Sequence, residues 1–92
     1  MIRVQFFGLL RLMLRQESVE VPTQRGDTVG QVLARAEGTL ATPIMHKLAD
    51  GGALHAGTII LVNRRNILHL RGLETPVSDG DTLALFPPGA GG

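Results

Sequence analysis

The residues of this sequence that could do chemistry are gathered in one segment, FPPGAGG, which runs from Phe86 to Gly92. Pro87 and Pro88 fix their φ angles and donate no backbone hydrogen bond, so they would end a strand and stiffen its exit from a sheet. The residues after them carry one methyl side chain in total: Gly89, Ala90, Gly91 and Gly92. Extended from Pro87 onward, this tail could reach about 20 Å and enter a slot too narrow for ordinary side chains. Glycine-rich termini of many other domains are simply frayed.

The carboxylate of Gly92 is the group at the tip of this tail that could react. A carboxylate can attack the α-phosphate of ATP, and the acyl-adenylate that forms has a good leaving group. The sequence lacks the G-x-x-x-x-G-K-[ST] loop that would hold a nucleotide phosphate, so activation would fall to an ATP-using partner. We therefore expect the chain to bind no cofactor itself and to supply no catalytic side chain.

The composition predicts one small globular domain over residues 1–86, followed by a flexible tail over residues 87–92. The chain has 92 residues, of which 43% are hydrophobic, and a net charge of only +1, which argues against nucleic acid as a partner. Cysteine is absent, which excludes disulfides and thiolate chemistry and fits a cytoplasmic location. The apolar run IILV is far shorter than the roughly 20 residues of a membrane-spanning helix, so we expect no membrane partner.

Alternating apolar residues predict a strand over residues 2–8 and a second one over residues 17–22, with residues 9–16 as the connection of a hairpin. Residues 26–38 change to helical spacing, which predicts the main helix. Thr28 and Gln31 have the spacing of a capping box, and Gly38 is placed to end this helix.

The second half of the chain predicts further strands and one short helix. Residues 42–52 could form that helix, with Thr42 as its cap, Pro43 at its first position and Gly51 or Gly52 as its end. The continuous apolar run in residues 57–63 is typical of a strand covered on both faces or nearly so. A turn at residues 63–66 would lead into a short strand at residues 67–70. A last strand over residues 82–86 follows a turn that contains Asp79 and Asp81.

This order of elements favours an α+β fold in which a mixed sheet of four to five strands packs on one main helix. The segments VQFFGLLRLML, TPVSDGDTLALFPP and FPPGAGG also resemble the small sulfur-carrier proteins of molybdopterin and thiamin-thiazole synthesis, the MoaD/ThiS family. The resemblance implies a ubiquitin-like β-grasp fold. It is loosest over residues 39–57, where this chain is longer than a minimal member of the family.

The resemblance also implies a sulfur-carrying cycle in which the protein is a cosubstrate or non-catalytic subunit. An adenylating enzyme of the ubiquitin-activating type would activate Gly92, and a sulfur donor would displace AMP to leave a thiocarboxylate. The sulfur would then pass to a pterin precursor on a synthase large subunit or to another sulfur acceptor, such as the forming thiazole ring. The FPP segment and the opening segment favour the molybdopterin branch, for a molybdenum or tungsten cofactor, over the thiazole branch.

Side chains near the tail are the candidates for binding these partners. Phe7 and Phe86 fall on the strand face opposite the predicted core, where they form an exposed apolar patch unless the long connection or the middle segment covers them. Arg11 lies in the segment that resembles the opening of the family. The predicted partner-binding residues are Phe7, Arg11, Phe86, Pro87, Pro88, Gly89 and Ala90, and the sulfur-carrying residues are Gly91 and Gly92.

Other polar residues have simpler interpretations. Arg64 and Arg65 are expected at a solvated turn, and the three histidines lack the spacing of a metal site. Two other functions stay open. A ubiquitin-like modifier would use the same activated terminus to acylate a lysine, and a β-grasp interaction domain would not use its tail at all.

Overall fold

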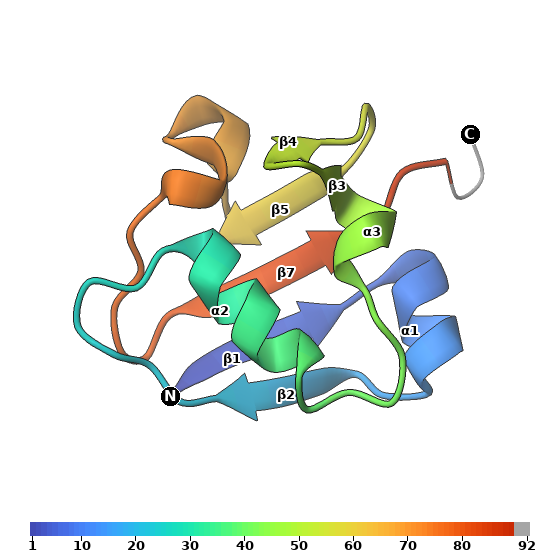
Figure 1. Cartoon of the computed structure of the whole chain (residues 1–92), viewed down its shortest axis with the longest axis horizontal. Coiled ribbons are helices and arrows are strands. Elements are labelled where there is room, and N and C mark those ends of the chain that lie inside the picture. Colours follow the sequence, from blue (N-terminus) through green and yellow to red (C-terminus); the bar gives the residue numbers. More distant parts are fainter. Residues whose placement is uncertain (90–92) are drawn as a thin grey trace.

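The fold comes from a computed structural model that describes residues 1–89 (Figure 1). Its centre is a mixed five-stranded sheet in the spatial order β2-β1-β7-β5-β6. These strands span Ile2–Phe6 (β1), Ser18–Val21 (β2), Ile59–Val62 (β5), Arg65–Asn66 (β6) and Thr82–Phe86 (β7). The sheet confirms the predicted α+β class.

Strands β1 and β7 lie side by side in the middle of the sheet, run parallel to each other and finish at the same end of it (Figure 1). The register places Arg3 of β1 beside Thr82 of β7. Strand β2 pairs antiparallel with β1, which confirms the predicted hairpin, and β5 pairs antiparallel with β7. The segment after β1 and the segment after β7 therefore leave the sheet side by side.

Helix α2 (Val29–Glu37) packs on one face of the sheet and begins as predicted. The side chain of Thr28 accepts a hydrogen bond from the backbone N–H of Gln31, and the Gln31 side chain accepts one from the Thr28 N–H. The apolar stripe of α2 is buried with the inward residues of the strands. Together they form the core, with Ile2, Val4, Phe6, Val29, Val32, Leu33, Ala36, Ile60, Leu83 and Leu85 among its members.

The connection between β1 and β2 contains a helix, α1 (Gly8–Leu14), which the sequence interpretation missed. Gly8 enters it with a φ of 58°, and Arg15 ends it in the left-handed region with a φ of 54°. Leu10 is buried against the core, whereas Leu12 is 74% exposed. The segment is apolar on several sides and has no side-chain cap, so it lacks the one-sided pattern from which a short helix is recognised.

Helix α3 (Met45–Leu48) is shorter than the predicted helix, and Thr42 and Pro43 lie before it. The carboxylate of Glu37, at the end of α2, accepts hydrogen bonds from the N–H groups of Ile44 (2.6 Å) and Met45 (2.8 Å). The cap of α3 is therefore supplied from another helix and not by Thr42.

The helix stop predicted at Gly51 or Gly52 was also wrong, because α3 ends at Leu48. The two glycines, with φ angles of 58° and 90°, instead make the turn of a small hairpin. Its strands are β3 (Ala49–Asp50) and β4 (Ala53–Leu54). Positive φ angles of this kind suit glycine, which explains both residues.

Two further expectations for the segment after residue 57 were wrong. Strand β5 is covered on one face only, because Ile59 is 42% exposed. The predicted strand over residues 67–70 is a 3₁₀ helix at Ile67–His69, because the Asn66 side chain accepts a hydrogen bond from the Leu68 N–H (2.9 Å) and turns the backbone. The short strand β6 precedes it, and the turn from β5 is made by Asn63 and Arg64 with positive φ angles.

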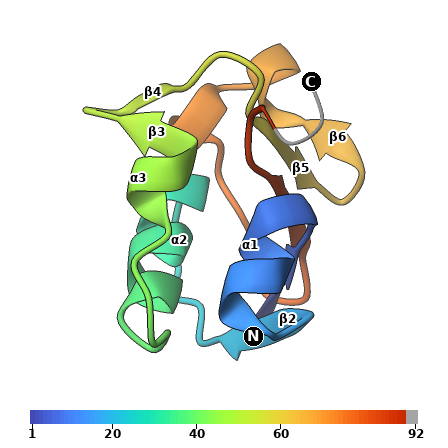
Figure 2. The same ribbon diagram turned by 90° about the vertical axis from the view of Figure 1, so that its right-hand side faces the viewer.

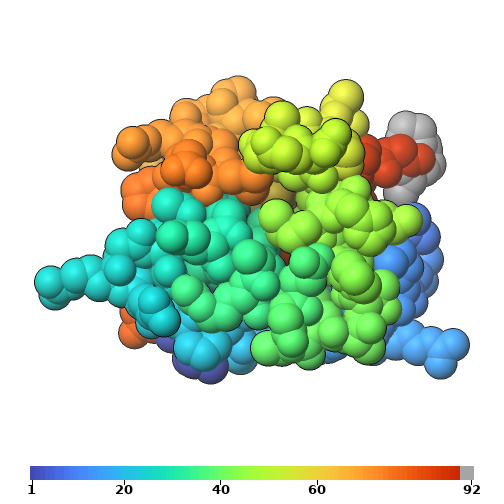
Figure 3. All heavy atoms as spheres, viewed as in Figure 1, coloured from blue at the N-terminus to red at the C-terminus, as the bar shows by residue number. Residues whose placement is uncertain are grey.

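The elements form two layers. Figure 2 shows α2 and α3 on one side of the sheet, with α1 at the end where β1 finishes. In the space-filling view, α2, α3 and the β3–β4 hairpin hide most of the sheet from that side (Figure 3). Within the described residues, none of the helices has both the length and the apolar character needed to cross a membrane.

Candidate functional site

The exit of β7 is the part of the structure that leads to the predicted reactive residues. The strand ends at Phe86, and Pro87 and Pro88 are each partly covered, whereas Gly89 is exposed. The predicted residues Ala90, Gly91 and Gly92 lie outside the described residues. Pro87 and Pro88 therefore lie partly against the body of the protein, and the chain becomes exposed at Gly89.

Gly57 contacts the exit segment directly. Its φ is 89°, and a Cβ atom built on it would lie 3.2 Å from the Cβ of Pro88. That separation is tighter than nine in ten real Cβ contacts, so one of the two neighbours would have to shift. Glycine suits both this backbone conformation and this close approach, so Gly57, two residues before β5, lets the loop pass close to Pro88.

The loop that carries Gly57 is itself held in place. Thr58 is buried, and its Oγ1 donates a hydrogen bond to the carbonyl of Leu48 in α3 (3.0 Å). A second bond joins a ring nitrogen of His55 and the carbonyl of His46 (2.8 Å). The position of Pro88 is therefore linked through Gly57 to α3, a connection that the sequence interpretation did not find.

Phe7 and Phe86 stack on each other where β1 and β7 end. Their ring centroids are 4.4 Å apart and their planes differ by 11°. The Phe7 N–H also donates to the carbonyl of Leu85 (3.0 Å). Both rings are partly exposed, so the two predicted residues form one aromatic surface beside the exit segment.

The stacked pair continues into an apolar strip on the sheet face away from α2. The register places Ile59 opposite Phe86 and Leu61 opposite Ala84. We call Phe7, Phe86, Ile59, Leu61 and Ala84 the apolar strip. An apolar patch that stays exposed on a small folded domain is typical of a surface that binds another protein.

Charged residues border this strip. Arg3 and Glu20 form an ion pair on the neighbouring strands (2.9 Å), and Arg11 of α1 pairs with Glu17 (3.2 Å). Arg11 also lines a hollow of about 290 Å³ together with Phe7. The structure thus brings the predicted residue Arg11 close to the apolar strip.

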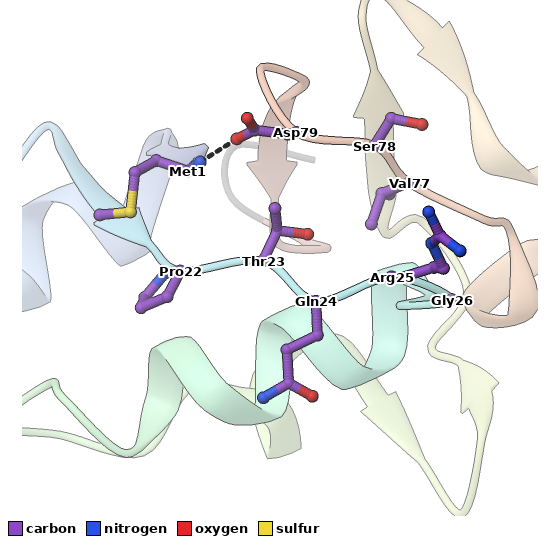
Figure 4. Close-up of a pocket in the computed structure, with 9 residues that line it drawn as sticks. All are labelled: Met1, Pro22, Thr23, Gln24, Arg25, Gly26, Val77, Ser78 and Asp79. Carbon is purple, nitrogen blue, oxygen red and sulfur yellow. Dashed lines mark hydrogen bonds and ion pairs between the residues drawn. The ribbon is translucent and has the colours of Figure 1, made fainter.

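A wider hollow of about 570 Å³ lies at the opposite end of the sheet, around the start of β1 (Figure 4). It is lined by Met1, Pro22, Thr23, Gln24, Arg25, Gly26, Val77, Ser78 and Asp79. The Met1 ammonium donates to the Asp79 carboxylate, which lowers the pKa of Asp79 below its usual range. This hollow is remote from the exit of β7, so we do not assign it to the tail chemistry.

One ion pair inside the fold has a structural role. The carboxylate of Asp27, which is 4% exposed, accepts two hydrogen bonds from Arg35 (2.8 and 3.0 Å) and one from the Gln24 N–H (2.7 Å). The Arg35 guanidinium, helped by that backbone N–H, holds the pKa of Asp27 well below its usual range. The pair ties α2 to the loop before it.

The described residues also bear on metal binding. Within residues 1–89, no three histidine, aspartate or glutamate side chains come together as metal ligands would. Asp79 and Asp81 lie in the predicted turn, where the Asp81 carboxylate accepts from the Ser78 N–H (2.8 Å). Asp81 also accepts from the side-chain amide of Asn63 (2.9 Å), and Asp79 accepts from the Met1 ammonium, so both carboxylates are engaged within the protein.

A mixed sheet with parallel central strands, one main helix across it and a last strand that leads to a glycine-rich tail is the ubiquitin-like β-grasp fold. The chain belongs to the ThiS family, whose model matches residues 4–92. This match confirms the resemblance found in the sequence.

Relatives with curated names are sulfur carriers or protein modifiers. The chain is 32% identical over 91 residues to small archaeal modifier protein 3 of Haloferax volcanii, covering 99% of this chain and 98% of that protein. It is 36% identical over 70 residues to the sulfur carrier protein CysO of Mycobacterium tuberculosis, covering 73% and 74% of the two chains.

A similar solved structure comes from the Amycolatopsis orientalis BexX/CysO complex. The matched chain superposes with a TM-score of 0.84 at 32% identity, over 100% of both chains. The comparison confirms the fold over the length of the chain.

Proposed function

We propose that this protein is a sulfur carrier whose Gly92 is adenylated by a separate enzyme and converted to a thiocarboxylate. The observation that carries the proposal is the family match, which extends to Gly92 and so includes the diglycine. The geometry supports it, because β7, Pro88 and Gly57 fix the direction in which the chain leaves the sheet. A fixed exit reduces the conformational freedom lost when the tail enters a partner's active site.

The chemistry needs three steps. A carboxylate oxygen of Gly92 attacks the α-phosphorus of ATP, and pyrophosphate leaves. A sulfide-level donor such as hydrosulfide then attacks the acyl carbon, and AMP leaves with the electrons of the broken C–O bond, which gives the thiocarboxylate. A persulfide donor would instead form an acyl disulfide, whose S–S bond a thiol of a partner would have to reduce. The thiocarboxylate sulfur finally attacks an acceptor. The chain supplies the acyl group, while ATP and the catalytic side chains come from the partners.

The apolar strip is the surface proposed to hold those partners. It lies beside the exit of β7, so a protein seated on Phe7, Phe86 and Ile59 would receive the tail at the same time. A relative with the same fold was solved in a BexX/CysO complex, which supports a protein partner for this chain. Arg11, at the border of the strip, would add a charged contact to the apolar ones.

The acceptor is proposed to be the sulfur-free precursor of a molybdopterin-type cofactor, bound to a synthase large subunit. This choice rests on the FPP and opening segments alone. A thiazole precursor is the alternative within the same chemistry. The two acceptors are distinguished by which synthase releases the sulfur of the loaded protein.

A ubiquitin-like modifier is the second candidate function. It is favoured by one observation, the 32% identity over 91 residues to a protein named as a small archaeal modifier. A modifier would share the adenylation of Gly92 and differ in the next step, where a lysine amine would attack the acyl carbon in place of sulfur.

The test is a reconstitution with ATP, a sulfur donor and the adenylating enzyme of the same organism. The intact mass should increase by the replacement of one oxygen with sulfur. A variant that lacks Gly91 and Gly92 should show no such increase. If the unmodified mass persists while the enzyme loads another carrier under the same conditions, the proposal is wrong.

A further inference from the structure

The positively charged side chains of this sequence are almost all arginines. It contains eight arginines but a single lysine, Lys47. A guanidinium stays protonated and does not accept an acyl group under ordinary conditions, whereas a lysine amine can lose a proton and attack an acyl carbon. An activated terminus could therefore acylate this protein itself at only two amines, Lys47 and the α-amine of Met1.

The α-amine of Met1 is poorly placed for this reaction. It forms an ion pair with Asp79 beside the hollow at the start of β1 (Figure 4). In that ion pair the amine donates a hydrogen bond to the Asp79 carboxylate, so it is already engaged by a neighbouring side chain. The start of β1 also lies at the opposite end of the sheet from the exit of β7 (Figure 1).

Lys47 is placed differently. It lies in α3, at the end of the molecule where β7 exits (Figures 1 and 2). None of the ion pairs described within residues 1–89 involves it. The residue is partly exposed, and a lysine in such a position can rest its stem on the surface while the amine stays in water.

The element that carries Lys47 is firmly anchored despite its short length. Ile44 and Leu48 are fully buried on either side of it, and Glu37 caps the backbone N–H groups at the start of the helix. The Lys47 N–H donates to the Ile44 carbonyl (3.0 Å). The amine is thus presented from a fixed backbone and not from a frayed loop.

We propose that Lys47 is a self-modification site, at which the activated Gly92 of one copy acylates a second copy of this protein. This inference rests on the proposed adenylation of Gly92. The neutral Lys47 amine attacks the acyl carbon of the adenylate, a C–N bond forms, and AMP leaves with the electrons of the broken C–O bond. The attacking nitrogen loses one proton to water and keeps the other as the amide N–H. One acceptor lysine in each copy means that the product grows as an unbranched chain with a single type of linkage.

The test uses two variants that can react in one direction only. The donor is Lys47→Arg, which keeps its tail but has no lysine. The acceptor lacks Gly91 and Gly92 but keeps Lys47, and the matched control is the same truncated chain with Lys47→Arg. Each pair is incubated with ATP and the adenylating enzyme, without a sulfur donor. Exchange of pyrophosphate with ATP reports activation of the donor independently.

The expected product has the summed mass of donor and acceptor less one water. Trypsin should release it as peptide 36–64 of the acceptor joined at Lys47 to peptide 72–92 of the donor. The control pair should give no such product. Normal exchange without a product, or an equal amount of product from the control pair, would overturn the assignment to Lys47 while leaving adenylation intact. If the exchange itself is absent, the proposed function has failed and this inference fails with it.

Discussion

Replacement of Gly57 by alanine tests whether the contact with Pro88 directs the tail. Gly57 has a φ of 89°, and an added Cβ would lie 3.2 Å from the Cβ of Pro88. The matched control is Gly26→Ala, because Gly26 has a φ of 86° and its Cβ would have no neighbour within 4 Å. Both variants place alanine in the left-handed region, and only one of them presses on the exit segment.

The expected loss of stability has two sources, the left-handed backbone conformation and the contact of the added Cβ with Pro88. Alanine at such a φ costs about 1 kcal/mol of unfolding free energy, which both variants should lose. The overlap with Pro88 would cost Gly57→Ala about 1 to 3 kcal/mol more if Pro88 stays in place. If Pro88 moves instead, the tail shifts, and kcat/KM for adenylation should fall about tenfold, since small misplacements of a reacting group have effects of this size.

Two measurements decide the outcome. Urea unfolding gives the free energy of each variant, and pyrophosphate exchange gives its kcat/KM with the adenylating enzyme. Gly57→Ala should differ from Gly26→Ala in at least one of the two. Equal stability and equal kcat/KM for both variants would refute the idea that Gly57 positions the exit segment.

Three further perturbations test other parts of the account. Phe86→Ala removes the stacked pair and should lower the unfolding free energy by about 1 kcal/mol. The KM of the adenylating enzyme for this protein should rise about tenfold. The control is Leu68→Ala, which changes a 62% exposed residue outside the apolar strip and should leave that KM unchanged. Thr28→Ala breaks the capping box and should lower the unfolding free energy by about 1 kcal/mol in urea titration, without any effect on adenylation. The pKa of Asp27 is lowered in the folded protein, so on acidification the unfolded chain takes up this proton first, and the unfolding free energy should fall as the pH drops below about 4. Asp27→Asn should flatten that part of the pH dependence. An unchanged slope would contradict the role of the Arg35 pair.

The elements with a one-sided apolar pattern could be predicted from the sequence. The alternation in β1 and β7 identified both central strands, and the spacing of Thr28 and Gln31 identified the start of α2. These signals are local, because the residues that form each pattern lie within the same element. The tail was predicted in the same way, from neighbouring prolines and glycines, and that part of the prediction stays untested.

The features that the sequence interpretation missed depend on contacts between distant residues. The cap of α3 comes from Glu37, and the partner of Gly57 is Pro88, so neither can be seen in a local window. The apolar run of β5 gave no indication of which side chains face outward, and Ile59 was therefore assigned to a covered strand. Helix α1 was missed because its apolar residues point both toward the core and toward solvent.

The central claim is that Gly92 carries sulfur, and the most direct measurement is the intact mass of the protein purified from the organism that makes it. A fraction of the molecules should carry one sulfur in place of one oxygen, and fragmentation should locate that sulfur at Gly92. Purified protein with only its unmodified mass, from cells that are making sulfur-containing cofactors, would contradict the account.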